Sequence, residues 1–139
     1  MTHSQAFTDT MRIVRQDEGG FANLPGDHGR ETYVGIARAF WPNWAGWKIV
    51  DSLRSYPDFP RVLAHNTPLQ NLVDDFYYQN FWTKIGGDHI SPEIAEAIMG
   101  DTINAGIPGG IRCAEQLVGL TPTGKISQNL INLLNTLQA

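Results

Sequence analysis

Cysteine is nearly absent from the sequence, and this limits the chemistry open to the chain. Cys113 is the single cysteine among 139 residues, so neither an internal disulfide nor a multi-cysteine metal site can form. It lies in the apolar run IRCAEQL, whose spacing is helical, and this favours a packed, inert thiol over a reactive one. A chain of this length can bury a core without disulfides.

Long apolar runs and clustered positive charge are also missing. No window approaches the roughly 20 apolar residues of a transmembrane helix, and the N-terminus lacks the basic stretch and apolar run of a signal peptide. We therefore expect a protein made in the cytoplasm without a signal peptide. Ten Lys and Arg residues against fourteen Asp and Glu residues give a net charge of −4, which argues against nucleic acid as a partner.

The histidines give no sign of a metal site. None of His3, His28, His65 and His89 has a partner at the spacing of a motif such as His-Glu-x-x-His. The sequence therefore predicts neither a metal nor another cofactor.

The periodicity of the chain predicts a mainly helical protein. Helices are expected over 4–18, from near 35, and over 45–54, 67–82, 91–104, 108–118 and 125–137. Thr67-Pro68 and Ser91-Pro92 are typical helix starts, in which a capping hydroxyl precedes proline at the first helical position. Glycine and proline are too dense over 19–35 for a helix, which predicts a loop or a small β-hairpin there.

Glu18 ends the first predicted helix on its apolar face. Phe7, Met11 and Val14 form a stripe whose next position is 18. Burial and the negative end of the helix dipole both disfavour the charged carboxylate, and Gly19 can end the helix while leaving the carboxyl open to the loop. A general acid needs such a protonated, rigid and accessible carboxyl. Taken alone, the periodicity fits an ordinary glutamate at a helix end better.

The loop after Glu18 contains groups that can assist an acid. Cleavage of a glycosidic bond needs a second carboxylate or a positioned water, and Asp27, Glu31 and Thr32 are available in this loop. Considered alone, Asp27 in the run PGDHG is better explained as an ordinary turn residue. The spacing leaves open which of the three works with Glu18.

Three segments of the chain resemble a known family over roughly residues 7 to 120. The run DEGGFANLPGDHGRETYVGIARAFWPNWAGW is similar to the opening motif of glycoside hydrolase family 108, the lysozyme-like N-acetylmuramidases of phage and prophage lysis cassettes. Members begin with a helix that ends in Glu-Gly-Gly, and the family's catalytic glutamate falls on Glu18. The runs FYYQNFWTKIGGDHI and IAEAIMGDTINAGIPGGIRCAEQLVGL resemble its aromatic segment and its C-terminal predicted peptidoglycan-binding region, with Asp101, Asn104 and Gly106 on matching positions.

The resemblance implies a mainly α, lysozyme-like single domain over 1–139. It would have about six to eight helices, with a glycine-rich loop or small β-hairpin after the first. Residues 1–90 would hold the catalytic motif, and residues 91–139 the C-terminal helices that resemble a peptidoglycan-binding region and pack in the same domain. The segment after Leu120 is short, so independent wall binding is not expected.

The resemblance also implies an activity of the endolysin type. This activity is hydrolysis of the β-1,4 bond between N-acetylmuramic acid and N-acetylglucosamine in peptidoglycan, with Glu18 as the general acid. Asp27, Glu31 or Thr32 would steady the oxocarbenium-like transition state or position the attacking water.

Substrate contacts are expected from a few of the polar and aromatic side chains. Tyr33, Asn23 and Tyr78 are the candidates, whereas most other aromatic residues are expected in the core. Asp101 lies on the apolar stripe of its helix, and we expect it to make a structural hydrogen bond.

Two alternatives use the same scaffold without catalysis. One is a scaffold that binds peptidoglycan, or a partner protein, without cutting the wall, and the other is an accessory factor for secretion or lysis that acts through protein contacts. In each case the expected partner or site of action is the cell wall, reached after release or export through a holin or a secretion system. A net charge of −4 gives no long-range attraction to an anionic wall.

Overall fold

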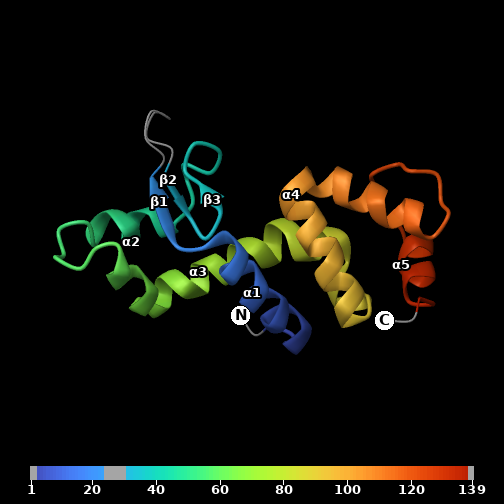
Figure 1. Cartoon of the computed structure of the whole chain (residues 1–139), viewed down its shortest axis with the longest axis horizontal. Helices are drawn as coiled ribbons and strands as arrows, with labels where there is room; N and C mark the ends of the chain where they lie inside the picture. Colours follow the sequence, from blue (N-terminus) through green and yellow to red (C-terminus); the bar gives the residue numbers. More distant parts are fainter. Residues whose placement is uncertain (1–2, 24–30, 138–139) are drawn as a thin grey trace. The chain divides into compact units, whose positions relative to one another are not determined.

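The computed structural model describes residues 3–23 and 31–137 and is mainly helical. The α-helices are α1 (Gln5–Glu18), α2 (Gly46–Ser52), α3 (Thr67–Tyr77), α4 (Pro92–Leu117) and α5 (Gln128–Leu134) (Figure 1). The short 3₁₀ segments are η1 (Arg61–His65), η3 (Thr83–Ile85) and η4 (Gly87–His89), and η2 (Tyr78–Trp82) is a π-helical turn. The strands β1 (Phe21–Asn23), β2 (Glu31–Tyr33) and β3 (Ile36–Ala37) form one antiparallel sheet in the order β1-β2-β3. A mainly α fold with a small hairpin after the first helix is thus confirmed.

Backbone contacts divide the chain into two compact units. The first unit comprises Met1–Met11 and Phe76–Ala139, and the second comprises Arg12–Asp75. The single domain expected from the sequence, with its parts at 1–90 and 91–139, stays a prediction.

Helix α1 carries the apolar stripe that the sequence predicts. Phe7, Met11 and Val14 are buried, and the half-buried Glu18 is the last helical residue. Gly19 follows with a φ of 74°, and its amide donates to the carbonyl of Arg15 at 3.0 Å. This left-handed residue ends the helix where the Glu-Gly-Gly run indicated.

The helix expected near residue 35 is wrong, because the chain reverses there in a tight hairpin. Tyr33 pairs with Ile36 across a turn formed by Val34 and Gly35, whose φ values are 47° and 76°. Positive φ at both central residues is typical of a type I′ hairpin turn, a geometry that valine rarely adopts. Burial of the Val34 side chain, which is 3% exposed, opposes the cost of this conformation.

The two capping hydroxyls predicted from the sequence are also wrong. The amide of Leu69 donates to Oδ1 of Asn66 at 2.9 Å, so Asn66 rather than Thr67 caps α3. Ser91 precedes α4 without a cap bond to its side chain, and its amide donates to Oδ1 of Asn135 at 3.0 Å. Ser91 is thus tied to Asn135, at the end of α5, through its backbone amide, and its hydroxyl does not cap α4.

Helix α4 is bent at Gly106, whose φ of 82° and ψ of 163° are not helical. Its two limbs meet at an angle in Figure 1, and they match the two separate helices predicted over 91–104 and 108–118. The buried face of the first limb includes Ile98 and Thr102, so Asp101 lies outside it and is exposed. Cys113 is likewise exposed, so both the structural role expected for Asp101 and the packed thiol are wrong.

Trp82 is the largest fully buried side chain of the first unit. Its ring lies edge-on to Phe7 at 5.4 Å between centroids, and its Nε1 donates to Oδ1 of Asp88 at 2.9 Å. A Cβ placed on Gly87 would come within 2.3 Å of the indole, so glycine is required for this contact. The indole therefore links η2, η4 and the start of α1.

Asp88 collects three hydrogen bonds in the first unit. Besides Trp82, the hydroxyl groups of Ser4 and Tyr78 donate to it at 2.6 Å and 3.0 Å. Desolvation on its own raises the pKa of this carboxyl, but the three hydrogen bonds outweigh it and lower the pKa.

Glu115, on the second limb of α4, closes the turn that leads to α5. Its Oε1 accepts from the amides of Thr123 and Gly124, and its Oε2 accepts from the Thr123 hydroxyl, all at 2.7 Å. Burial on its own raises the pKa of Glu115, but the bond from the Gly124 amide and the two from Thr123 outweigh burial and lower the pKa.

We expect Glu115→Gln to lower the melting temperature by several degrees at neutral pH. The amide keeps the shape but loses the charge that strengthens three hydrogen bonds. Since the folded pKa lies below the ordinary 4.5, this contribution is present above that pH and is lost as the pH falls through the folded pKa. Thermal unfolding at about pH 7 and about pH 3 measures the difference. A difference in melting temperature between the wild type and Glu115→Gln that is equal at both pH values would contradict this role.

Candidate functional site

Glu18 lies at the junction between α1 and the sheet of the second unit. Strand β1 begins at Phe21, three positions later, and the amide of Val34 donates to the Gly20 carbonyl at 3.2 Å. The chain between Glu18 and Gly20 spans at most about 7 Å from Cα to Cα. Glu18 therefore lies close to the start of the sheet.

A chain of hydrogen bonds holds the last turn of α1. Arg15 donates to Oε1 of Gln70 at 2.5 Å and pairs with Asp74 at 2.7 Å, both residues of α3. Gln70 donates in turn to the Tyr33 hydroxyl at 3.0 Å and to the Leu63 carbonyl at 2.9 Å. The turn that ends at Glu18 is thus tied to α3 and β2, which restricts where its carboxyl can move.

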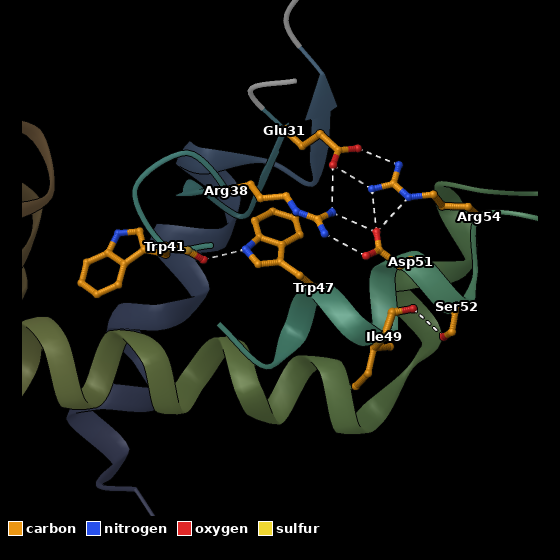
Figure 2. A network of polar contacts seen from close by, with 8 residues as sticks. All are labelled: Glu31, Arg38, Trp41, Trp47, Ile49, Asp51, Ser52 and Arg54. Atoms are coloured by element: carbon orange, nitrogen blue, oxygen red, sulfur yellow. Dashed lines mark hydrogen bonds and ion pairs between the residues drawn. The ribbon is translucent and has the colours of Figure 1, made fainter. Parts of the chain in front are cut away.

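Glu31, the first residue of β2, belongs to a network of four charged side chains (Figure 2). Arg38 pairs with Glu31 at 3.0 Å and with Asp51 at 2.8 Å. Arg54 pairs with Glu31 at 2.6 Å and with Asp51 at 3.0 Å. The guanidinium of Arg38 also lies 5.1 Å from the ring of Trp47, which is buried. The network joins β2 to α2 and the segment after it.

The network shifts the pKa values of Asp51, Arg38 and Arg54 toward their charged forms. The hydrogen bond from Arg38 is the main cause that lowers the pKa of Asp51 to about 2, and the bond from Arg54 adds to it. Hydrogen bonds to Asp51 and Glu31 raise the pKa of Arg38, and a bond to Glu31 is the main cause that raises the pKa of Arg54. The ion pairs of Asp51 with Arg38 and Arg54 are therefore stabilised in their charged form.

An open pocket of about 200 Å³ lies beside the sheet of the second unit. It is lined by Gly20, Phe21, Tyr33, Pro60, Arg61 and Ala64. Phe21 is held from outside the pocket by Phe59, at 5.1 Å between ring centroids, and by the guanidinium of Arg54 at 5.8 Å. Gly20, which lines the pocket, is also part of the turn that follows Glu18.

The structure places the other predicted residues differently. Tyr33 is 4% exposed and lines the pocket. The half-buried Thr32 points to the face of β2 opposite Glu31 and Tyr33, because side chains alternate along a strand. Asn23 is exposed at the end of β1, and Tyr78, in the first unit, donates its hydroxyl to Asp88. Asp27 lies outside the described residues.

Four arginines and an aspartate of this region were missed from the sequence. They are Arg15, Arg38, Arg54, Arg61 and Asp51. Asp51 and Arg54 are three residues apart at the end of a predicted helix, and this spacing indicates an ion pair between them. Nothing in the sequence marked the others.

The described ranges contain no group of three or more His, Cys, Asp and Glu side chains placed to hold a metal ion. Within the same ranges, no helix has the length and apolar character of a membrane-spanning segment.

We expect Glu31→Gln to lower the free energy of unfolding by about 1–2 kcal/mol. One carboxylate bridges two guanidiniums, and the cost is moderate because both arginines are about a third exposed. Specific activity of the folded protein should fall less than about tenfold, whereas loss of a group in proton transfer costs roughly 10²–10⁴-fold. Urea unfolding and a wall-clearing assay measure the two effects, with the exposed Asp58→Asn as the control. A loss of activity without loss of stability would assign Glu31 to the chemistry instead.

Comparisons with known proteins identify a family by sequence and a similar fold by structure. Residues 11–106 match the sequence model of the family described as Glycosyl hydrolase 108. The fold is similar to that in "Structure of Brucella abortus SagA", with a TM-score of 0.65 at 23% identity, covering 95% of this chain and 70% of that one. At this identity the likeness shows a shared fold. No curated protein matches the sequence.

Proposed function

The chain belongs to the glycosyl hydrolase 108 family, and from this membership we propose that it cleaves peptidoglycan as an N-acetylmuramidase. The family makes it a glycoside hydrolase and supports peptidoglycan as the substrate. The proposed reaction is hydrolysis of the β-1,4 bond between N-acetylmuramic acid and N-acetylglucosamine. The observation that carries the proposal is the half-buried carboxyl of Glu18, at the end of α1 and beside the sheet.

Glu18 is the proposed general acid. Its helix end is held by the bonds of Arg15 to Gln70 and Asp74, so the carboxyl is positioned before the substrate arrives. The two glycines after it leave space, since a Cβ built on Gly19 or Gly20 meets no atom within 4 Å. A substrate can therefore approach the carboxyl from the side of the sheet. Protonation of the glycosidic oxygen by Glu18 would then assist departure of the leaving sugar.

Of Asp27, Glu31 and Thr32, the three residues that could assist Glu18 in catalysis, Glu31 is the least suited. Its carboxylate is paired with two guanidiniums, so a substrate or a water molecule would have to compete with both arginines for it. Its role in the proposed mechanism is to position β2. Thr32, on the other face of that strand, and Asp27 remain as groups that can place the attacking water or steady the developing positive charge.

Mass analysis of digested peptidoglycan tests the proposed bond. An N-acetylmuramidase leaves N-acetylmuramic acid at the new reducing end, and borohydride reduction then marks that sugar. Reduced N-acetylglucosamine at the new ends would instead indicate cleavage of the other glycosidic bond. Walls that bind the protein but release no fragments would favour the non-catalytic alternative.

The site of action follows from the substrate. We propose that the protein acts on the cell wall after release or export, through a holin or a secretion system. Fractionation of producing cells, with wall-released fragments as the readout, tests this route.

A further inference from the structure

We infer that Arg61 binds a carboxylate on the substituent of muramic acid, in the pocket beside Glu18. The inference rests on the proposed function and names the part of the substrate that this pocket recognises. In intact walls the carboxylate belongs to the stem peptide, and in peptide-free glycan it is the lactyl carboxylate itself. Both are anions attached to the same sugar.

The walls of the pocket suit an apolar group that carries a charge. Phe21, Tyr33, Pro60 and Ala64 supply mostly carbon surface, and Arg61 is the charged residue among the lining side chains. The Tyr33 hydroxyl accepts a hydrogen bond from Gln70, and its ring forms part of the pocket wall. A methyl or the face of a sugar fits such walls, while the guanidinium can take a carboxylate through two parallel hydrogen bonds.

Arg61 differs from the three arginines of the second unit that form ion pairs close to the pocket and to Glu18. Arg15, Arg38 and Arg54 each pair with a carboxylate of the protein at 3.0 Å or less. Within the described residues, the exposed side chain of Arg61 makes neither a hydrogen bond nor an ion pair. Its charge is therefore available to a ligand, in a protein whose own net charge of −4 repels anions at long range.

The position of the pocket matches a substituent next to the cleaved bond. Gly20 lines the pocket and is separated from Glu18 by a single residue, so their Cα atoms lie within about 7 Å. Muramic acid contributes its anomeric carbon to the bond that the proposed activity cleaves. A carboxylate on that sugar held at Arg61 would fix which bond faces Glu18.

The pocket is also built to keep its shape. Phe21 is packed against Phe59 and lies under the Arg54 guanidinium, which the network with Glu31 fixes. Tyr33 is fixed by Gln70. A pre-formed wall lowers the cost of ordering side chains when the ligand binds.

The test compares native walls with walls whose carboxylates have been converted to methylamides. Arg61→Ala should lower kcat/KM on native peptidoglycan about tenfold, through KM, which is the expected size for one charge-assisted hydrogen-bonded contact. Wild-type protein should lose a similar factor on the amidated walls, and Arg61→Ala should lose little more there. Arg61→Lys should recover part of the loss. Lys48→Ala, an exposed cation on α2 outside the pocket, is the matched control and should behave as wild type.

Peptide-free glycan, prepared with an amidase, separates the two sources of the carboxylate. If Arg61→Ala is impaired on peptide-bearing walls alone, Arg61 binds a carboxylate of the stem peptide. If it is impaired on both substrates, Arg61 binds whichever anion the sugar carries, the stem-peptide carboxylate in walls and the lactyl carboxylate in peptide-free glycan. Equal losses on native and amidated walls, or no loss at all, would overturn the inference.

Co-sedimentation with cell walls measures binding in the absence of cleavage, so it tests carboxylate binding by Arg61 independently of the proposed activity. The Glu18→Gln protein, with and without Arg61→Ala, is spun down with native or amidated walls, and the bound fraction is measured. Weaker pelleting of the double variant on native walls alone supports carboxylate binding even if no bond is cut. Absence of cleavage by the wild type would contradict the proposed function without deciding the role of Arg61.

Discussion

Glu18→Gln is expected to reduce the rate of peptidoglycan cleavage by roughly 10²–10⁴-fold, with little change in stability. Glutamine keeps the shape of the side chain but has no proton to give to the leaving oxygen. Among the described residues the Glu18 side chain makes no hydrogen bond or ion pair, so its replacement removes no contact that holds the fold. Clearance of a purified wall suspension gives the rate, and thermal unfolding gives the stability.

Asp17→Asn is the matched control for this experiment. Asp17 precedes Glu18 on the same helix and is exposed, so its substitution makes the same change in net charge beside the site. The control should clear walls at the wild-type rate. If Glu18→Gln does so as well, the proposed mechanism is wrong. If both variants lose activity equally, the local charge is responsible and Glu18 has no special role.

The end of α1 could be predicted because it depends on neighbouring residues alone. The stripe of Phe7, Met11 and Val14 sets the buried face, and Gly19 provides the left-handed ending. Both signals lie within one helix and the residue that follows it. For the same reason the break of α4 at Gly106 was found, since a glycine with positive φ and a following proline act locally.

The surroundings of Glu31 could not be predicted, because they are assembled from separate segments. Arg38 meets Glu31 across the hairpin of β2 and β3, whose register the sequence did not predict, and Arg54 follows α2, 23 residues from Glu31. Without these partners, Glu31 looked as suitable for catalysis as Thr32. The turn at Val34 was missed for a related reason, since valine disfavours positive φ and its tertiary burial overrides this preference.

Four arginines of the second unit have different roles around the proposed site. Arg15 holds the last turn of α1, which ends at Glu18. Arg38 and Arg54 pair with Glu31 on β2, and Arg54 also packs on Phe21 in the wall of the pocket. These three are neutralised by carboxylates of the protein, so they add rigidity and little net charge. Arg61 alone among the pocket residues is left to act on an anionic ligand.

Trp82→Ala is expected to lower the free energy of unfolding by about 3–5 kcal/mol, the largest stability effect foreseen for this chain. The indole is fully buried, with an exposure of 0%, and its removal would leave a cavity beside Phe7 and Gly87. It would also remove one of the three hydrogen bonds that Asp88 accepts. Urea unfolding followed by circular dichroism measures the change.

Two further variants separate packing from hydrogen bonding at Trp82. Trp82→Phe keeps much of the ring but loses the bond to Asp88, and we expect a loss of about 1–2 kcal/mol. Leu117→Ala, whose side chain is 67% exposed in the same unit, should change stability by less than about 0.5 kcal/mol. Equal losses for Trp82→Phe and Trp82→Ala would mean that the hydrogen bond, and not the packing of the ring, supplies the stability. A loss at Trp82→Ala no larger than that at Leu117→Ala would contradict the buried position of the indole, since a cavity in a packed core always costs more than an exposed methyl group.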